Sequence, residues 1–343
     1  MEISNITHLT SFILIGFPST MILQNLIFAI LLLIYLATLA GNILMIVIII
    51  SDCYLHTPMY ILLVNLSVME VCGISAVTPK LLSILIGDEI TISYSGCHIQ
   101  TLFYFTIITA VFLMLAVMSF DRYVAICHPL RYSTIIRHAV CMQLVGICLT
   151  LSFVCILFPV TLISTLTYCR RILNHFFCHI GAMVELLCED VGFIKLYILI
   201  FSTFILVIPL IITTLSYVFI VHTVVRMPSD KGCMKTFSTC ASHLTMVSIV
   251  YGCAIFIQIR PSRYYSMETD KFVNLVSTVL SPLLNPFIYT LRNQKVKDSI
   301  RNALWKEKTT IRLPSSSPHL AILNFFFIIS KRGASYFLLI WLS

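Results

Sequence analysis

The stretch Gln24–Ile50 reads QNLIFAILLLIYLATLAGNILMIVIII and contains no charged residue. A helix rises about 1.5 Å per residue, and the hydrocarbon core of a bilayer is about 30 Å thick, so about 20 apolar residues cross it. This stretch is therefore long enough to span a membrane as one helix. No basic n-region and no cleavage signal precede it, so we expect it to be retained and to direct insertion.

Six further apolar runs follow, and short charged segments separate them. The second run of the chain is the least regular, because it contains Glu70 and Pro79. The pattern predicts an all-α membrane protein, a bundle of seven transmembrane helices. The six further runs are Pro58–Leu85, Gln100–Ile126, Val140–Thr165, Gly192–Val225, Thr236–Ile259 and Phe272–Leu291.

Composition excludes the soluble classes of protein. Hydrophobic residues make up 59% of the 343 residues, charged residues only 10%, and the mean hydropathy is +0.99. A soluble domain carries about 25% charged residues. The chain is therefore not expected to be a soluble enzyme, a disordered chain or a nucleic-acid-binding protein.

The charged residues predict the orientation in the membrane. With the N-terminus outside, the cytosolic segments hold 15 basic and five acidic residues, and the outer segments hold seven basic and eight acidic residues. Basic residues concentrate on the cytosolic side of membrane proteins. The net charge of +8 is thus explained by topology, and we expect no nucleic acid among the partners.

Four of the 13 cysteines fall in the outer segments, where disulfides form and persist. They are Cys97, Cys169, Cys178 and Cys188, and their spacing alone leaves the pairing open. The sequon Asn5-Ile6-Thr7 lies in the outer N-terminal segment, so we expect Asn5 to be glycosylated.

No catalytic motif, cofactor-binding motif or metal-ligand spacing is present in the sequence. A seven-span transporter or channel is the alternative class of function, but the two halves show no internal repeat and the spans no ring of polar residues. Ionisable residues inside a membrane mark function by default. The pair Asp121–Arg122 ends the third span, where it is either a positive-inside anchor or a switch that releases the arginine toward a cytosolic partner.

Several longer motifs occur in a fixed order along the chain. They are Gly41-Asn42, LHTPMY at Leu55–Tyr60, MSFDRYVAIC at Met118–Cys127, KTFSTCASHL at Lys235–Leu244 and PLLNPFIY at Pro282–Tyr289. With these motifs the chain, from about Asn5 to Leu304, resembles the odorant receptors of the class II (tetrapod-type) branch, a group of rhodopsin-like G-protein-coupled receptors.

The resemblance implies a function and a set of partners. A receptor of this kind binds a small odorant, lies in membrane lipid at the plasma membrane of sensory cilia, and activates the stimulatory olfactory G protein to raise cyclic AMP. The resemblance implies the disulfides Cys97–Cys178 and Cys169–Cys188. The residues that it assigns to the switch and to G-protein coupling are Asp121, Arg122, Tyr123, Tyr217, Lys235, His243 and Tyr289.

Two departures from the family pattern concern acids within the membrane. Glu70 stands where the family usually has aspartate, and Val111 stands where it usually has glutamate. Two interpretations of Glu70 therefore remain open: it binds no metal, or it forms a weak sodium site. The lost acid at Val111 and the unusual C-terminal tail also support the alternative that the chain is a non-functional receptor relic.

Helical spacing back from Arg122, together with family positions in the later spans, nominates a ligand pocket between the outer halves of the helices. Ordinary helix packing is the alternative role for each residue. An amine ligand would need a buried acid, and none is present in this set. We therefore predict neutral, largely apolar volatiles that carry a hydrogen-bonding oxygen. The nominated residues are Tyr104, Phe105, Ile108, Thr109, Phe112, Phe201, Ser202, Ile205, Leu206, Tyr251, Ala254, Ile255, Gln258, Asn274 and Thr278.

The chain is expected to divide into four parts. Residues 1–23 form an extracellular segment, 24–291 the receptor domain, 292–308 a cytosolic amphipathic helix on the membrane surface, and 309–343 an atypical extension. The extension contains the apolar stretch Leu320–Leu342 with Lys331-Arg332 at its centre. Because charges at mid-bilayer are unfavourable, we predict that it does not span the membrane; an interfacial hairpin is the alternative.

Overall fold

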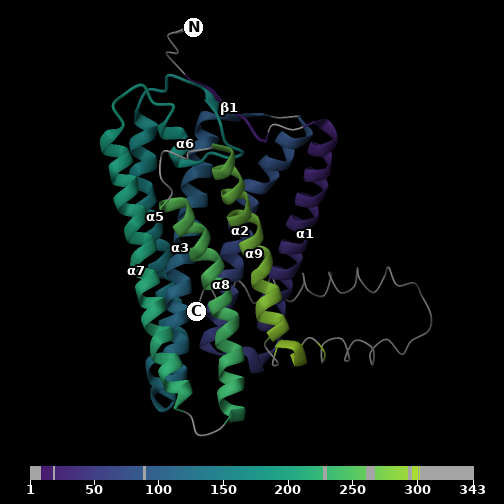
Figure 1. Ribbon diagram of the computed structural model, residues 1–343, viewed down its shortest axis with the longest axis vertical. Helices are drawn as coiled ribbons and strands as arrows, with labels where there is room; N and C mark the ends of the chain where they lie inside the picture. The colour runs from purple at the N-terminus through teal and green to yellow at the C-terminus, as the bar shows by residue number, and fades with distance from the viewer. Residues whose placement is uncertain are drawn as a thin grey trace, which may run out of the picture.

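The computed structural model of the chain describes residues 9–17, 20–87, 90–226, 230–259, 267–292, 296–299 and 301. Seven long helices lie side by side within these ranges and form an elongated bundle (Figure 1). Their bounds are α1 Met21–Ser51, α2 Pro58–Ile86, α3 Tyr94–Cys127, α5 His138–Thr165, α7 Gly192–Val225, α8 Asp230–Ile259 and α9 Met267–Arg292.

The shorter elements lie between the long helices. They are the 3-10 turns η1 (Cys53–Leu55) and η2 (Pro129–Arg131), the short helices α4 (Tyr132–Ile135) and α6 (Ile180–Val184), and the strands β1 (Ser11–Leu14), β2 (Thr91–Ser93) and β3 (Ile172–Leu173). Helix α3 packs against α2, α5, α7 and α8, so it is the central helix of the bundle.

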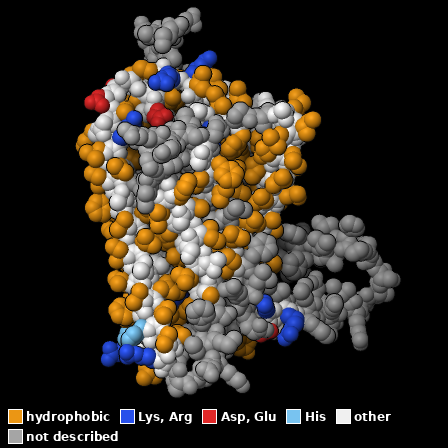
Figure 2. Space-filling model, viewed as in Figure 1, with side chains coloured by type: hydrophobic (Ala, Val, Ile, Leu, Met, Phe, Trp, Pro, Cys, Tyr) orange, Lys and Arg blue, Asp and Glu red, His pale blue; other side chains and the backbone are white. Residues whose placement is uncertain are grey.

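The surface of the bundle fits a protein that lies in a membrane. Five helices of the described chain, α1, α2, α3, α5 and α7, are long and apolar enough to cross a membrane, and α8 contains the shorter apolar stretch His243–Phe256. Hydrophobic side chains cover the sides of the bundle, whereas the coloured charged side chains gather at its two ends (Figure 2). Lipid is the solvent that suits such a surface, because water would leave a very large apolar area exposed.

Local sequence explains where the helices begin and end. Thr57 precedes α2, and Pro58 occupies its first turn, where the missing N–H is not needed. The helix stops at Gly87, whose φ of +83° is a left-handed conformation that glycine adopts readily. Helix α3 begins after Ser93, whose hydroxyl accepts a hydrogen bond from the Gly96 N–H at 3.2 Å. The predicted third run starts later, at Gln100, because the first turns of α3 are polar.

A three-stranded sheet covers one end of the bundle, which we call the sheet end. Strand β1 is its middle strand; it pairs antiparallel with β2 and parallel with β3, in the order β2-β1-β3. Phe12 and Leu14 are buried, whereas Ser11 and Ile13 are partly exposed, which is the alternation of a strand that covers a core on one face. The sheet adds to the predicted all-α bundle, and its strands are too short to be recognised in the sequence.

Helices α1 and α9 approach each other closely at a polar contact. The Asn42 side-chain Nδ2 donates to the carbonyl oxygen of Pro282 at 3.0 Å. The preceding residue, Gly41, faces the ring of Pro286, and a Cβ at Gly41 would lie 2.9 Å from the Pro286 Cγ. The small residue therefore lets the two helices approach, as in other membrane bundles.

Replacement of Gly41 tests this contact. We expect Gly41→Ala to lower the free energy of unfolding by about 1–3 kcal/mol, because the added methyl group overpacks the contact with the Pro286 ring. Thermal unfolding of the purified chain in lipid nanodiscs measures the change. Gly146 in α5 is the matched control, because a Cβ there meets no heavy atom within 4 Å. Equal stability of both variants would contradict the predicted clash.

Candidate functional site

The end of the bundle opposite the sheet contains a buried ion pair, and we call this end the Arg122 end. Arg122 and Asp121 lie near the end of α3, and their side chains form a salt bridge; the Arg122 Nε lies 2.9 Å from the Asp121 Oδ2. The Asp121 side chain is only 2% exposed and that of Arg122 16%. Removing one member of such a buried pair would leave the other charge uncompensated in low dielectric, which is strongly destabilising.

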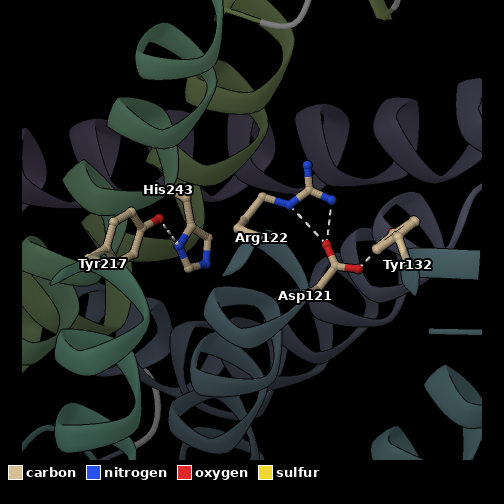
Figure 3. A network of polar contacts seen from close by, with 5 residues as sticks. All are labelled: Asp121, Arg122, Tyr132, Tyr217 and His243. Atoms are coloured by element: carbon tan, nitrogen blue, oxygen red, sulfur yellow. Dashed lines mark hydrogen bonds and ion pairs between the residues drawn. The ribbon is translucent and has the colours of Figure 1, made fainter. Parts of the chain in front are cut away.

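Tyr132 adds a third member to this network (Figure 3). Its hydroxyl, on the short helix α4, donates to the Asp121 Oδ1 at 2.8 Å. Both carboxylate oxygens of Asp121 are thus engaged, one by Arg122 and the other by Tyr132. Burial, and next the negative charge of Asp121, raise the pKa of Tyr132, so the phenol remains protonated and keeps donating its hydrogen.

A second polar pair joins α7 to α8 at the same end. The Tyr217 hydroxyl lies 2.7 Å from the His243 Nδ1, and the two rings stack with centroids 6.0 Å apart. Figure 3 shows this pair on one side of Arg122, with Asp121 and Tyr132 on the other. The His243 Nε2 is buried without a hydrogen-bond partner in the described part of the chain.

Apolar contacts hold these polar groups in place. Tyr217 packs in a cluster with Ile220, Val224 and Cys240, and Tyr123 lies against the same cluster. The hydroxyl of Tyr123 lies 3.0 Å from the Nε2 of His128, where α3 has ended. Three of the predicted switch elements, namely the α3 end, Tyr217 and His243, therefore meet at one end of the bundle.

One apolar side chain at the Arg122 end has no apolar cover. Leu130 lies in η2, directly before α4, and is 95% exposed. An exposed leucine is unremarkable on its own. Here it lies on the short segment that also contains Tyr132, so a partner that covers Leu130 would lie next to the Asp121 network. The sequence prediction did not single out Leu130 or Tyr132.

At the sheet end, two disulfides fix the loop between α5 and α7. Cys97 in α3 is bonded to Cys178, and Cys169 is bonded to Cys188 within the loop. These are the two pairs that the resemblance implies. The sheet and the disulfides together attach the N-terminal strand, the α2–α3 loop and the α5–α7 loop to the end of α3.

Residues His175–His179 of that loop form a lid over the N-terminal end of α3. The Gln100 side chain accepts a hydrogen bond from the Cys178 N–H at 3.0 Å and donates to the Ala76 carbonyl at 2.8 Å. The Thr101 hydroxyl donates to the carbonyl oxygen of Cys178 at 2.8 Å. These bonds fix the loop backbone to α2 and α3, so the lid has a defined position.

The lid covers the first of the nominated pocket residues. The Phe177 ring lies 5.0 Å from that of Tyr104, and the His179 ring lies 5.3 Å from that of Phe105, between ring centroids. The Tyr104 hydroxyl lies 2.7 Å from the Thr278 Oγ1 and so joins α3 to α9. The sequence prediction missed the lid; the proximity of its aromatic residues to Cys178 was the available signal.

The remaining nominated residues lie deeper or toward α7. Phe112 and Tyr251 are in contact, and the Tyr251 hydroxyl donates to the Phe112 carbonyl at 3.1 Å. Leu206 packs in the same core cluster, which Ala254 and Ile255 border. Phe201 borders the cluster below the sheet, as Phe105 does. Thr109 is buried, whereas Ile108, Ser202, Ile205 and Asn274 are partly buried.

Some predicted residues lie outside the described residues. Nothing is described of Asn5, nor of the side chains of Gln258, Lys235 and Tyr289. The C-terminal extension, residues 309–343, also lies outside. For the amphipathic helix predicted at 292–308, the structure describes a helical segment at residues 296–299.

Polar groups also lie in the middle of the bundle. Glu70 is 4% exposed, and its Oε2 has no hydrogen-bond partner among the described residues; the same holds for the Oδ1 atoms of Asn42 and Asn285. In the described part of the chain, no three His, Cys, Asp or Glu side chains are grouped so that they could hold a metal ion. Both interpretations of Glu70, a weak sodium site and no metal binding, therefore remain open.

The structure places two different clusters at opposite ends of one helix. A lidded, aromatic region lies at the sheet end, and a buried ion pair lies at the Arg122 end. Helix α3 contributes to both, with Tyr104 near one end and Arg122 near the other. A receptor requires such a connection between two distant sites, because a change at one has to reach the other.

Comparisons with known proteins give the family. The sequence profile described as olfactory receptor matches residues 31–307. The human olfactory receptor 6B2 is 40% identical over 311 residues, which cover 90% of this chain and 100% of that protein. The human olfactory receptor 6J1 is 43% identical over 294 residues, which cover 85% of each chain. The human olfactory receptor 6T1 is 42% identical over 313 residues, covering 91% of this chain and 97% of that protein.

The chain therefore belongs to the olfactory receptor family. It is a receptor of the G-protein-coupled type and not an enzyme, and its apolar helices make it a multi-pass membrane protein.

A double-mutant cycle tests the bond between Tyr132 and Asp121. We expect Tyr132→Phe to lower the free energy of unfolding by about 1.5 kcal/mol, because a hydrogen bond to a carboxylate is lost. In the Asp121→Asn background the same change should have a smaller effect. Thermal unfolding in nanodiscs measures both. Tyr54→Phe is the control, because Tyr54 is 85% exposed. A cycle with no coupling energy would contradict the network.

Proposed function

We propose that all seven long helices cross the membrane, with the N-terminus outside and the C-terminus in the cytosol. The excess of basic residues in the segments assigned to the cytosol supports this orientation. The two disulfides at the sheet end also support it, because disulfides persist on the oxidising side. In this arrangement residues 1–23 are extracellular, 24–291 form the receptor domain, 292–308 lie on the inner membrane surface, and 309–343 extend from it.

The ligand that we propose is a small, neutral, largely apolar volatile with one hydrogen-bonding oxygen. It binds at the sheet end, between the outer halves of the helices and below the lid. The lining is aromatic and aliphatic with a few hydroxyl groups, such as those of Tyr104 and Thr278. Binding to such a lining is favourable, because it removes apolar ligand surface from water.

The signalling step that we propose is activation of a stimulatory olfactory G protein, which raises cyclic AMP. The observation that carries the proposal is the buried Asp121–Arg122 pair at the Arg122 end. A bound odorant shifts the population toward a state in which Arg122 leaves Asp121 and faces the G protein. The exposed Leu130 gives the G protein an apolar contact beside this network. The location proposed for this activity is the plasma membrane of sensory cilia.

Arg122→Ala tests the signalling step. We expect it to abolish the odorant-dependent rise in cyclic AMP in cells that express the chain with the olfactory G protein, because the charge that the G protein meets is lost. Leu130→Ala should reduce the response several-fold. Surface staining must match that of the unchanged chain. A full response of the Arg122→Ala variant at equal surface level would refute the proposed coupling.

Neighbouring hydroxyls on α7 test the pocket. Ser202 is partly buried and Thr203 is exposed, although both hydroxyls donate to the Leu199 carbonyl. We expect Ser202→Ala to raise the half-maximal concentration of an oxygen-bearing odorant about fivefold, because the hydroxyl that can turn from the Leu199 carbonyl to the ligand is lost, and with it one hydrogen bond of about 1 kcal/mol. Thr203→Ala should leave it unchanged, because its side chain faces lipid. The same concentration for both variants would show that this face of α7 does not contact the ligand.

A further inference from the structure

Among the buried nitrogen-bearing side chains at the sheet end are Lys271 and His175, and neither was predicted to contact a ligand. Lys271, near the start of α9, is 0% exposed, and its Nζ donates to the carbonyl oxygen of Gly16 at 2.9 Å. His175, in the lid, is 4% exposed. Its Nε2 is buried without a hydrogen-bond partner in the described part of the chain. A buried polar group without a partner is unusual and calls for one.

The hydrogen bonds of the lid determine which ring nitrogen of His175 carries the proton. Its Nδ1 accepts a hydrogen bond from the Phe177 N–H at 3.4 Å, so the proton of the neutral ring is assigned to Nε2. Burial, and next the neighbouring His179 and Lys271, lower the pKa of His175 well below its usual value, so the ring is neutral. His175 therefore offers a single buried N–H donor.

His179, beside His175, has the same hydrogen-bond arrangement. The two imidazole rings stack with centroids 5.0 Å apart, and the His179 Nδ1 accepts a hydrogen bond from the Gly181 N–H at 3.2 Å. Its proton is therefore assigned to Nε2 as well. The donor without a hydrogen-bond partner among the described residues is the His175 Nε2–H. A single N–H of this kind is complementary to an oxygen that only accepts.

The N–H donor of His175 lies close to the first residues of the proposed odorant pocket. The His175 ring is 4.6 Å from that of Phe177, which in turn contacts Tyr104. Lys271 and Thr278 are seven residues apart on α9, so two helical turns place them on the same face, about 10 Å apart along the axis. A ligand whose apolar body lies against Tyr104 can reach the N–H donor of His175 with its polar end.

Cationic ligands do not fit this position. Two adjacent histidines often bind a metal ion, but each of these rings uses the lone pair of Nδ1 for a backbone N–H and has its proton on Nε2. The His175 Nε2–H presents the positive end of its dipole to a ligand, so it also disfavours a cationic amine.

We propose that His175 is the polar subsite of the odorant pocket and that it selects ligands with a carbonyl oxygen. The favoured class is ketones, aldehydes and esters. An alcohol fits less well, because its own hydroxyl hydrogen would need an acceptor. The subsite rests on the odorant pocket proposed above and assigns its specificity.

Matched eight-carbon compounds test the subsite. Purified full-length receptor in lipid nanodiscs is titrated with octan-2-one, octan-2-ol and 2-aminooctane, and the dissociation constants are obtained from the thermal stabilisation that each causes. We expect octan-2-one to bind at least about fivefold more tightly than octan-2-ol, the ratio for one hydrogen bond, and 2-aminooctane to bind most weakly. Equal binding of all three compounds would overturn the proposal.

Substitutions of His175 test whether this side chain causes the preference for octan-2-one. His175→Phe keeps an aromatic ring and removes the N–H donor, so the preference for octan-2-one should disappear; His175→Gln supplies an N–H donor and should retain it. His98→Phe is the matched control, because His98 is also buried at the sheet end but both of its ring nitrogens are bonded, to the Tyr94 carbonyl and the Tyr168 hydroxyl. An unchanged preference in His175→Phe would overturn the proposal.

Binding and signalling are measured separately. The dissociation constants are obtained without a G protein, whereas the proposed function is tested by cyclic AMP. A carbonyl preference that depends on His175, without any cyclic AMP response, would support the subsite and contradict the signalling step. A cyclic AMP response to odorants with no dependence on His175 would support the proposed function and overturn the subsite.

Discussion

The structure depends on one constraint: a polar backbone group or a charged pair inside a bilayer is stable only when its partner lies within the protein. Helices satisfy the backbone groups, and one side chain can neutralise another. The ion pair of Asp121 and Arg122 is the clearest case, because both side chains are largely buried and the second carboxylate oxygen accepts from Tyr132. A change that breaks such a pair leaves a buried charge exposed to low dielectric, so the network has few stable arrangements and can act as a switch.

The two ends of the bundle are held together by different kinds of contact. At the sheet end, two disulfides and strand β1 fix the loops to α3. At the Arg122 end, hydrogen bonds and apolar contacts join α3, α4, α7 and α8, and in the described residues the cysteines Cys127 and Cys240 there are free thiols. The sheet end is therefore held more rigidly, and the Arg122 end can rearrange more readily, as the proposed ligand binding and signalling require.

The sequence predicted the long helices well, because an apolar run of membrane length has few other folds available. The predicted run Gly192–Val225 coincides with α7. The sheet could not be predicted, since β1 has four residues and gains stability only from its partners in distant loops. The contacts of His175, Tyr132 and Leu130 were missed for the same reason: each depends on where a loop lies against a helix. The motif residues Asp121, Arg122, Tyr217 and His243 were nominated together, and the structure brings them to one end.

The central claim is that Asp121 holds Arg122 in an inactive arrangement. Its most direct test is the cyclic AMP level, without odorant, in cells that express the Asp121→Asn variant with the olfactory G protein at the same surface level as the unchanged chain. The uncharged amide keeps the shape of the side chain but binds the guanidinium less strongly. The account predicts a basal level several-fold above that of the unchanged chain. A basal level equal to or below it would contradict the claim.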